Sequence, residues 1–383
     1  MKKGIKRKST CWHEPAKPLN ASRSKDSNHF PGLRRIESGD QRWFGCLYPI
    51  LLIILYIGLF VMIRKDIWRY YDSLNEAIYY FKDQKLQSCL HLVVVPVLIL
   101  SSIVRSSDDL EGYKKLDCVD RLLFYLNAPI DHAAGTREEV SNLCVYVFLT
   151  LVTNLLTYFD VVMAGSGVDF DVAWILSHVP VLLEVVILCG FVAVIAKIRV
   201  RFERTNLVIA ETLTPRKISV ILVQSTSFDN ASKLRLARRV HFQLHDVAAA
   251  VNKTYGFRMF FIFFVTLFSI LNHFRNAIAL RDDPLGIMDL GLHLVWICFH
   301  IAKYFYVANA CHATVSEGKL AGGYFLGAPV VRGPSGLSEE MEAFSRQLDN
   351  KQLQFTLVSV FAIDIPKGVT IFIAVITYFL VLC

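Results

Sequence analysis

Polar and aromatic side chains recur at helical spacing inside four long apolar stretches of this chain, between residues 140 and 312. Side chains that form hydrogen bonds are costly in hydrocarbon, so within a membrane they usually face the interior of a helix bundle or water. Aromatic faces combined with donors and acceptors suit a small polar organic ligand. The candidate ligand-binding residues are Thr157, Tyr158, Asp160, Trp174, His178, Ser269, Asn272, His273, His293 and Trp296.

The same residue types can instead join helices to one another. Ser, Thr and Asn often bond across helices or to their own backbone four residues earlier. For any single Thr this alternative is the simpler interpretation, whereas for the aromatic and charged candidates taken together we favour a ligand pocket in the outer half of the bundle. Glu184 is the one acid deep in an apolar stretch, and we expect it to be paired, protonated or functional.

The four stretches belong to a set of seven that are long enough to cross a membrane. A transmembrane helix needs roughly 20 mostly apolar residues, with every backbone group bonded internally. A content of 54% hydrophobic residues and a mean hydropathy of +0.42 exceed what a soluble domain of 383 residues usually carries. We therefore predict an all-α, polytopic membrane protein with seven transmembrane helices, near residues 43–63, 88–105, 140–164, 172–196, 256–280, 286–312 and 353–383.

Lys and Arg are concentrated on one side of this arrangement. The segment before the first span carries eleven Lys and Arg residues, and so does the gap between the fourth and fifth spans. The second-to-third gap and the end of the sixth span, which includes Lys303, lie on the same side of the membrane as these two segments. The opposite side carries only seven Lys and Arg residues. Because basic loops stay in the cytoplasm, we expect a cytoplasmic amino terminus and an extracellular carboxyl terminus. The expected parts are a cytoplasmic amino-terminal segment (1–42), a six-helix ligand-binding bundle (43–312) with cytoplasmic helix extensions (197–255), a cytoplasmic loop with an amphipathic helix (313–352), and a seventh, pore-lining helix (353–383).

Two segments outside the spans also have helical patterns. Apolar residues recur from Leu234 to Val251 without an intervening Pro, which predicts a helix that continues into the fifth span. Further on, Ser338 is the expected N-cap of an amphipathic helix that carries Met341, Phe344 and Leu348. We expect such extensions to pack on each other or on neighbouring subunits; a solvated regulatory loop is the alternative.

Several functional classes do not fit the sequence. A Gly-rich phosphate loop, a His-Glu-x-x-His zinc motif and a Gly-x-Ser-x-Gly elbow are all missing, so we expect neither an enzyme nor a cofactor. The nine cysteines have neither disulfide nor metal spacing, and the net charge of +8 is dispersed beside the spans, without the aromatic platform of a nucleic-acid site. A G-protein-coupled receptor would run the other way across the membrane, and its Asp-Arg-Tyr and Asn-Pro-x-x-Tyr signatures are missing at the expected places.

Two parts of the chain carry a resemblance to a known family. The first runs from Leu244-His245-Asp246 through Asn252 to Tyr255-Gly256, at the entry to the fifth span. The second comprises Phe344, Gln347, Leu348, Phe355, Thr356, Phe361, Asp364 and Thr377-Tyr378. In these residues, and in its seven spans with an inside amino terminus, the whole chain resembles the insect gustatory receptors. The family continues with Gln-Phe where this chain stops at Cys383, so a role for that glutamine is not carried over.

This resemblance implies a ligand-gated, non-selective cation channel in the plasma membrane of a sensory neuron dendrite, gated by a small soluble tastant. It also implies a homotetramer, or a heterotetramer with other gustatory receptors, whose seventh helices line one pore in contact with membrane lipids. On that helix the expected pore residues are Thr370, Ala374, Thr377, Tyr378 and Val381. Small residues that merely let helices pack closely are the alternative. Lys367 is unfavourable in a cation pore, and we expect it at the inner vestibule, paired with Asp364.

Other functions remain open at this stage. An odorant-gated channel of the sister family would share the architecture, and a secondary transporter would also bind its ligand among polar residues within the membrane. Transporters usually show internal repeats with Gly- or Pro-broken helix pairs at matching places, and we find no convincing repeat. The sequence does not separate bitter or plant compounds from sugars as the ligand.

Overall fold

The computed structural model describes residues 47–62, 80–163, 170–213, 223–279, 287–327 and 336–382. The chain divides into two units, Met1–Tyr48 and Pro49–Cys383. Of the first unit only Leu47 and Tyr48 are described, and they begin the apolar helix Leu47–Met62. The following sections concern the second unit.

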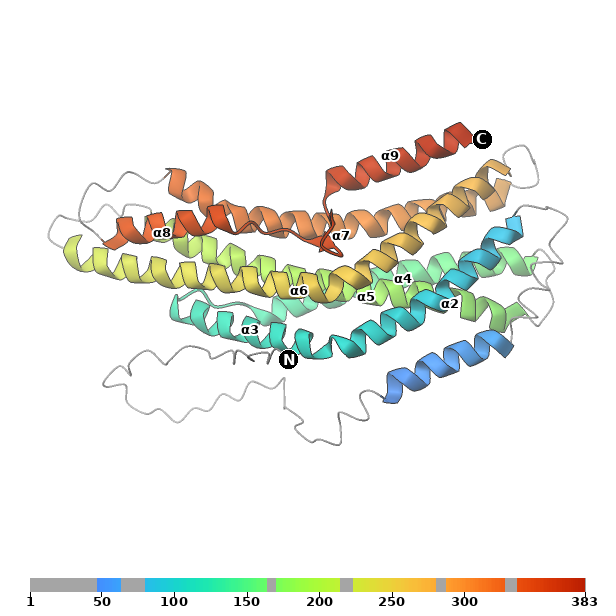
Figure 1. Cartoon of the computed structure of the whole chain (residues 1–383), viewed down its shortest axis with the longest axis horizontal. Coiled ribbons are helices and arrows are strands. Elements are labelled where there is room, and N and C mark those ends of the chain that lie inside the picture. Colours follow the sequence, from blue (N-terminus) through green and yellow to red (C-terminus); the bar gives the residue numbers. More distant parts are fainter. Residues whose placement is uncertain are drawn as a thin grey trace, which may run out of the picture. The chain divides into compact units, whose positions relative to one another are not determined.

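Helices account for nearly all of the described residues (Figure 1). Among the described residues, four helices are long and apolar enough to cross a membrane, and the apolar segments Leu47–Met62, Cys89–Val104 and Ile365–Val375 are shorter. Together these seven elements overlap all seven expected spans. The helices after Leu47–Met62 are α2 Tyr80–Val104, α3 Ser106–Tyr125, α4 His132–Met163, α5 Phe170–Leu213, α6 Val223–Ala279, α7 Ile287–Gly327, α8 Gly336–Asn350 and α9 Ile365–Leu382.

The three longest helices, α5, α6 and α7, pack against one another and form the centre of the bundle (Figure 1). Their shared core includes Phe191, Ile195 and Phe202 of α5 and Leu244 of α6, all fully buried. The 57 residues of α6 span roughly 86 Å at 1.5 Å per residue, whereas the hydrocarbon of a bilayer is about 30 Å thick. The prediction of a helix that continues into the fifth expected span is therefore confirmed, and α6 exceeds the thickness of the hydrocarbon by roughly 56 Å.

The expected amphipathic helix is α8, which packs on α6 and α7. It begins at Gly336 rather than after Ser338. The ring of Phe344 is fully buried and meets Phe325 of α7 and His241 of α6 edge to face, at 5.0 and 5.3 Å between centroids. This part of the chain outside the spans is thus a packed helical body.

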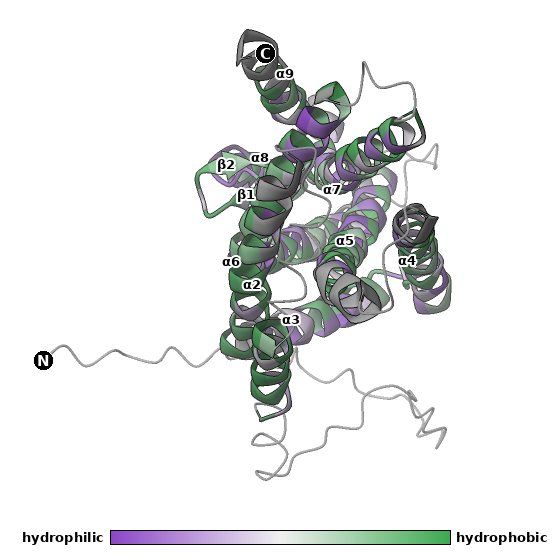
Figure 2. Ribbon diagram, turned by 90° about the vertical axis from the view of Figure 1, so that its right-hand side faces the viewer, coloured by the Kyte–Doolittle hydropathy of each residue, from purple (hydrophilic) through white to green (hydrophobic). Residues whose placement is uncertain are grey.

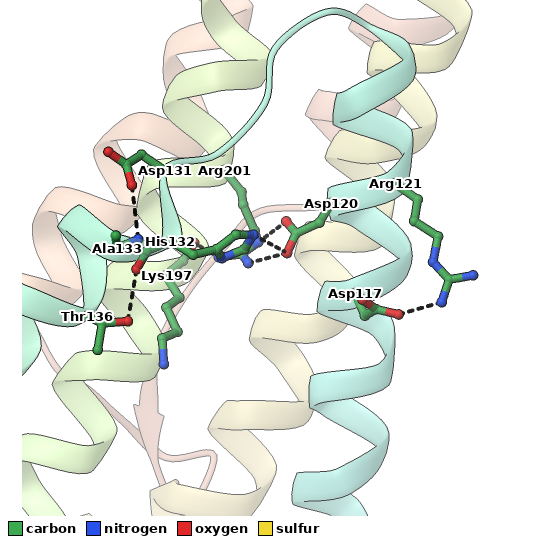
Figure 3. A network of polar contacts seen from close by, with 9 residues as sticks. All are labelled: Asp117, Asp120, Arg121, Asp131, His132, Ala133, Thr136, Lys197 and Arg201. Atoms are coloured by element: carbon green, nitrogen blue, oxygen red, sulfur yellow. Dashed lines mark hydrogen bonds and ion pairs between the residues drawn. The ribbon is translucent and has the colours of Figure 1, made fainter. Parts of the chain in front are cut away.

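Helix α3 was not expected, because its residues were assigned to a loop between the second and third spans. Leu116, Val119 and Leu123 lie at i, i+3 and i+7 and are buried against the bundle, a spacing typical of an amphipathic helix. Arg201 of α5 binds Asp120 of α3 through two hydrogen bonds, of 2.7 Å from Nε and 2.6 Å from Nη2 (Figure 3). This bidentate pair joins α3 to the central helices.

The seventh expected span is shorter than predicted. The segment expected as helix from residue 353 first forms an antiparallel hairpin of β1 Thr356–Leu357 and β2 Phe361–Ala362, and α9 begins only at Ile365. Asp364 caps the helix, because its Oδ1 accepts a hydrogen bond of 2.8 Å from the Lys367 backbone N–H. Pro366 is tolerated beside the cap, where the first N–H groups of a helix have no partner within it.

Helix α9 lies at the edge of the bundle beside α7 in both views (Figure 1, Figure 2). Phe372 packs on Tyr304 and Phe305 of α7, with ring centroids 5.5 and 5.8 Å apart. Val369 and Ile373, in contrast, are 41% and 58% exposed. One side of α9 is therefore anchored on α7, and other apolar side chains of this helix remain uncovered in the single chain.

Candidate functional site

Three aromatic rings from α6 and α7 stack within the predicted ligand-binding region. His273 lies parallel to Trp296, with an interplanar angle of 3° and 5.7 Å between centroids. His300 stacks on both, at 5.8 Å from His273 and 5.6 Å from Trp296. Trp296 and His300 are only 5% and 2% exposed, so these rings form a buried aromatic cluster between the two helices.

Helices α4 and α5 approach the same cluster. The indole N–H of Trp296 donates a hydrogen bond of 3.0 Å to Thr157 Oγ1 of α4. The Thr157 hydroxyl in turn donates to the backbone carbonyl of Thr153, also at 3.0 Å. His178 of α5 lies with its ring centroid 6.3 Å from that of Trp296. Four helices thus contribute side chains to this one cluster.

His273 and His293 are paired with each other. His273 Nδ1 and His293 Nδ1 are 3.1 Å apart, so one of these nitrogens is protonated and donates a hydrogen bond to the other. His293 is 4% exposed. The stacked rings and the paired nitrogens together fix the orientation of both imidazoles.

Ser269 and Asn272 belong to a different contact. Gln87 of α2 donates from Nε2 to Ser269 Oγ, and Asn272 Nδ2 donates to Gln87 Oε1, both at 3.1 Å. Gln87 was not predicted, because its segment precedes the expected second span. The signal was available, since a side-chain amide next to an apolar helix needs partners in the bundle.

The remaining candidates are placed less fully. Tyr158 of α4 lies with its ring 6.2 Å from that of its chain neighbour Phe159. Asp160 and Trp174 fall in α4 and α5, but their side chains lie outside the described part, so their roles stay predictions.

Several polar atoms on the helices that form this cluster are buried without a hydrogen-bond partner among the described residues. They include both amide atoms of Asn154, Thr266 Oγ1 and His300 Nδ1. Asn154 lies one turn before Thr157, and His300 one turn after Trp296. Because buried polar groups are normally satisfied, these atoms can accept or donate bonds to a ligand or to water.

The cluster itself is packed ring against ring, with 5.6 to 5.8 Å between stacked centroids, and two hollows lie elsewhere among the described residues. One of about 10 Å³, enough for about one water, is lined by residues that include Tyr113, Val194 and Thr254. A wide, open depression of about 570 Å³ lies along the start of α4, at His132, Thr136 and neighbouring residues. A ligand that enters between the stacked rings therefore requires side-chain movement.

Glu184, expected to be paired, protonated or functional, is paired. Lys303 Nζ of α7 donates a hydrogen bond of 3.1 Å to Glu184 Oε2, and His91 Nε2 of α2 lies 3.8 Å from Glu184 Oε1. The Glu184 and Lys303 side chains are 2% and 1% exposed. By sequence Lys303 belongs with the charges of the inner side, and the structure adds that its ammonium is buried in an ion pair. A buried acid requires a counter-charge, which was the signal for this pair.

The expected pore residues occupy α9. Thr370, Ala374 and Thr377 are all exposed in the single chain. The Thr370 and Thr377 hydroxyls donate to backbone carbonyls four residues earlier, at 3.0 and 2.8 Å. The side chains of Tyr378 and Val381 lie outside the described part. Lys367 Nζ is 3.4 Å from Asp364 Oδ2, which confirms the expected pairing.

Residues that carried the resemblance meet at the entry to α9. Asn252 of α6 donates from Nδ2 to Thr356 Oγ1 at 3.0 Å, and its Oδ1 accepts from the Thr356 N–H at 2.8 Å. A Cβ added at Gly256 would come within 2.8 Å of the Thr356 carbonyl oxygen. Only glycine allows the hairpin to lie this close to α6, so the hairpin before α9 is held directly on α6.

Two histidines of α6 lie before the fifth expected span, in the expected cytoplasmic extension of this helix. His241 Nε2 donates to the Gly318 carbonyl at 3.0 Å. Its Nδ1 is buried without a hydrogen-bond partner among the described residues. Burial lowers the pKa of His241 to about 3, and the nearby His245 adds to this effect. Burial also lowers the pKa of His245 to about 4, with a further contribution from Lys351. Both imidazoles are therefore neutral in the folded protein at neutral pH.

Comparison with known proteins shows to which family this chain belongs. The family model described as 7tm chemosensory receptor matches residues 34–383, and the chain therefore belongs to the chemosensory receptor family. Among solved structures, it is similar to the insect olfactory receptor OR5 from Machilis hrabei, with a TM-score of 0.54, 13% sequence identity and 92% of each chain covered. The same receptor in complex with eugenol gives a TM-score of 0.54 and 12% identity, again with 92% of each chain covered.

At these identities the similarity concerns the fold. No curated protein matches the chain in sequence. The prediction of an all-α, multi-pass membrane protein of an insect chemosensory receptor family is confirmed. The assignment of the receptor subtype is taken up below.

Proposed function

We propose that the chain is a gustatory-type receptor: a ligand-gated, non-selective cation channel opened by a small soluble tastant, either a bitter or plant-derived compound or a sugar. Membership of the chemosensory receptor family supports the receptor role. The residues at the entry to the fifth span and around Thr377-Tyr378 support the gustatory subtype through their resemblance to that family. The same resemblance implies a plasma-membrane location in a sensory dendrite and a homo- or heterotetramer with other gustatory receptors.

The observation that carries this proposal is the buried cluster around Trp296. Stacked rings provide flat faces for an organic ligand, and the unsatisfied atoms of Asn154 and His300 provide hydrogen-bonding capacity. An apolar core without a ligand role would contain few such atoms, because each one costs about 1–3 kcal/mol when left unpaired. The ligand we propose therefore combines a ring or apolar face with several polar groups.

The conduction path in this proposal runs along α9. Its exposed small and hydroxylated residues, Thr370, Ala374 and Thr377, suit a water-filled passage once four copies surround a common axis. Lys367 is held by Asp364 at the start of the helix, which reduces its repulsion of cations. The proposed orientation has the amino terminus in the cytoplasm and the carboxyl terminus outside, with the pocket in the outer half of the bundle.

Voltage clamp of cells that express the chain tests the proposal, with a panel of sugars and alkaloids as ligands. We expect large ligand-evoked currents that reverse near zero potential. Replacing Trp296 or His293 with Ala should raise the concentration for half-maximal response at least tenfold. The matched control is His312→Ala, which changes an exposed histidine of the same helix and should shift that concentration less than twofold.

If the Trp296→Ala and His293→Ala variants reach the surface and respond as the wild type does, the pocket lies elsewhere. A response to volatile apolar compounds alone would favour an odorant-gated channel. The fold shared with an olfactory receptor makes that function the second candidate. Small currents coupled to substrate uptake would favour a secondary transporter.

A further inference from the structure

Glu184 and Lys303 form a charged pair inside a segment that crosses the membrane. The pair joins α5 to α7 at 3.1 Å, with side chains 2% and 1% exposed. The ammonium of Lys303 also lies 5.5 Å from the ring centroid of Phe299, a cation–π distance. His91 of α2 approaches the other carboxylate oxygen at 3.8 Å. Three helices therefore meet at one buried charge pair.

Such a pair restricts how α7 can move against α5. Separating two buried charges leaves each without compensation, which is strongly unfavourable, whereas the intact pair adds little net stability. The Glu184–Lys303 contact thus mainly fixes the position of α7 relative to α5. A rotation or translation of α7 that separates the two charges must break the whole pair.

The next residue along α7 holds the pore helix. Consecutive residues lie 100° apart around a helix, so Tyr304 points toward α9 while Lys303 points toward α5. The Tyr304 hydroxyl donates to the Asp364 carbonyl at 3.1 Å. A Cβ added at Gly368 would lie only 2.0 Å from Tyr304 Cε1. The start of α9 therefore follows any displacement of this turn of α7.

The proposed pocket adjoins the Glu184–Lys303 pair along α7, on the amino-terminal side of Lys303. His300, which stacks on Trp296, is one turn before Lys303 on the same helix. A ligand that displaces His300 or Trp296 acts on the turn of α7 that carries both Lys303 and Tyr304. Pocket, charge pair and pore helix are thus connected through one continuous segment, residues 296–304.

We propose that the Glu184–Lys303 pair is a latch that positions α7 and thereby holds α9 in its resting place until a ligand moves this segment. The proposal rests on the proposed channel function. Glu184 and Lys303 are positioning residues in this scheme: they act on the pore through Tyr304 and do not themselves line it.

The position of α9 can be measured without conduction. With Thr370→Cys introduced on the exposed face of α9, the rate of modification by a charged thiol reagent reports how accessible this helix is, relative to the same chain without the new cysteine. We expect Lys303→Met and Glu184→Gln to increase this rate at least fivefold and to increase the ligand-independent current. Exchanging the two charges, Glu184→Lys with Lys303→Glu, should restore both to within twofold of the wild type.

The matched control is a second pair between helices, Lys197 and Glu139, 3.0 Å apart and more exposed. Lys197→Met should change neither readout by more than twofold. Where a neutral variant does not reach the surface, Lys303→Arg keeps the charge but changes its geometry, and it should increase the modification rate at least twofold.

The latch is refuted if Lys303→Met and Glu184→Gln, or Lys303→Arg in their place, reach the surface with wild-type modification rates. It is equally refuted if the charge exchange folds but does not restore them, since the pair would then serve packing alone. A wild-type chain that passes no ligand-evoked current, while Lys303→Met still accelerates modification of Thr370→Cys, would refute the channel function and support the latch.

Discussion

The contact between Gly368 and Tyr304 gives the sharpest prediction for the packing of α9. In Gly368→Ala the new methyl group would lie 2.0 Å from Tyr304 Cε1 and 2.7 Å from Cζ, whereas carbon atoms pack at 3.5–4.0 Å. The ring must retreat by about 1.5 Å to reach that distance. Tyr304 is only 7% exposed, between Phe263 and Phe372, so it has little space.

We expect Gly368→Ala to lower the free energy of unfolding by about 1–3.5 kcal/mol, once the gain of about 0.5–1 kcal/mol that Ala gives a helix over Gly is subtracted. Overpacking contributes about 1–3 kcal/mol, and the displaced hydroxyl loses its bond to the Asp364 carbonyl, about 1 kcal/mol. The measurement is reversible denaturation of the purified protein in detergent. The control is Gly291→Ala in α7, where an added Cβ meets nothing within 4 Å; it should stabilise by up to about 1 kcal/mol, because Ala favours a helix over Gly.

The effect of Gly368→Ala on the free energy of unfolding should change sign when the Tyr304 ring is removed. With Tyr304→Ala already present, the space beside Gly368 is open, and the same Gly368→Ala substitution should now stabilise by about 0.5–1 kcal/mol. If Gly368→Ala is neutral or stabilising while Tyr304 is intact, α9 does not pack on α7 in this way. The proposed connection between the pair at Lys303 and α9 is then lost as well.

Two further predictions concern the helices outside the spans. Asp120→Asn should lower the free energy of unfolding by about 2–4 kcal/mol, because it leaves the guanidinium of Arg201, which is 5% exposed, without its counter-charge. The control Asp117→Asn removes an exposed ion pair and should cost under about 1 kcal/mol. Equal effects of the two substitutions in denaturation experiments would contradict the structure. The pKa values of about 3 for His241 and about 4 for His245 lie below the value of about 6.5 in an unfolded chain, so the folded state binds fewer protons; the free energy of unfolding should be highest above pH about 6.5 and fall toward pH 4. His241→Gln should flatten this dependence between pH 4 and 6.5, and an unchanged slope would show that His241 is not buried as a neutral ring.

Much of the fold follows from local sequence patterns. The lengths of the apolar stretches located the spans, and the apolar pattern from Leu234 to Val251 predicted the continuous α6. Both features depend only on residues that are close together in the sequence. Helix α3 was missed because its buried residues, such as Leu116 and Val119, are interspersed with charges that suggested a loop. The start of α9 was misplaced by about twelve residues, because apolarity does not distinguish a hairpin from a helix and the cap at Asp364 was not used.

The candidate site was predictable in composition but not in its partners. The sequence identified Thr157, His293 and Trp296 as inward-facing, since polar groups in an apolar helix avoid lipid. Which of them touch depends on the register between helices far apart in the sequence. The same limit explains why Gln87 was overlooked and why Lys303 was not recognised as the partner of Glu184.

The length of α6 has a practical consequence for experiments on this receptor. About 33 residues of α6 precede Gly256 and extend for roughly 50 Å at 1.5 Å per residue, and α8 is packed along them. In the proposed topology this part of α6 protrudes from the detergent belt and gives each particle a feature that helps to align images in electron cryo-microscopy. It also offers a surface on which antibody fragments could be raised without disturbing the lipid-facing helices.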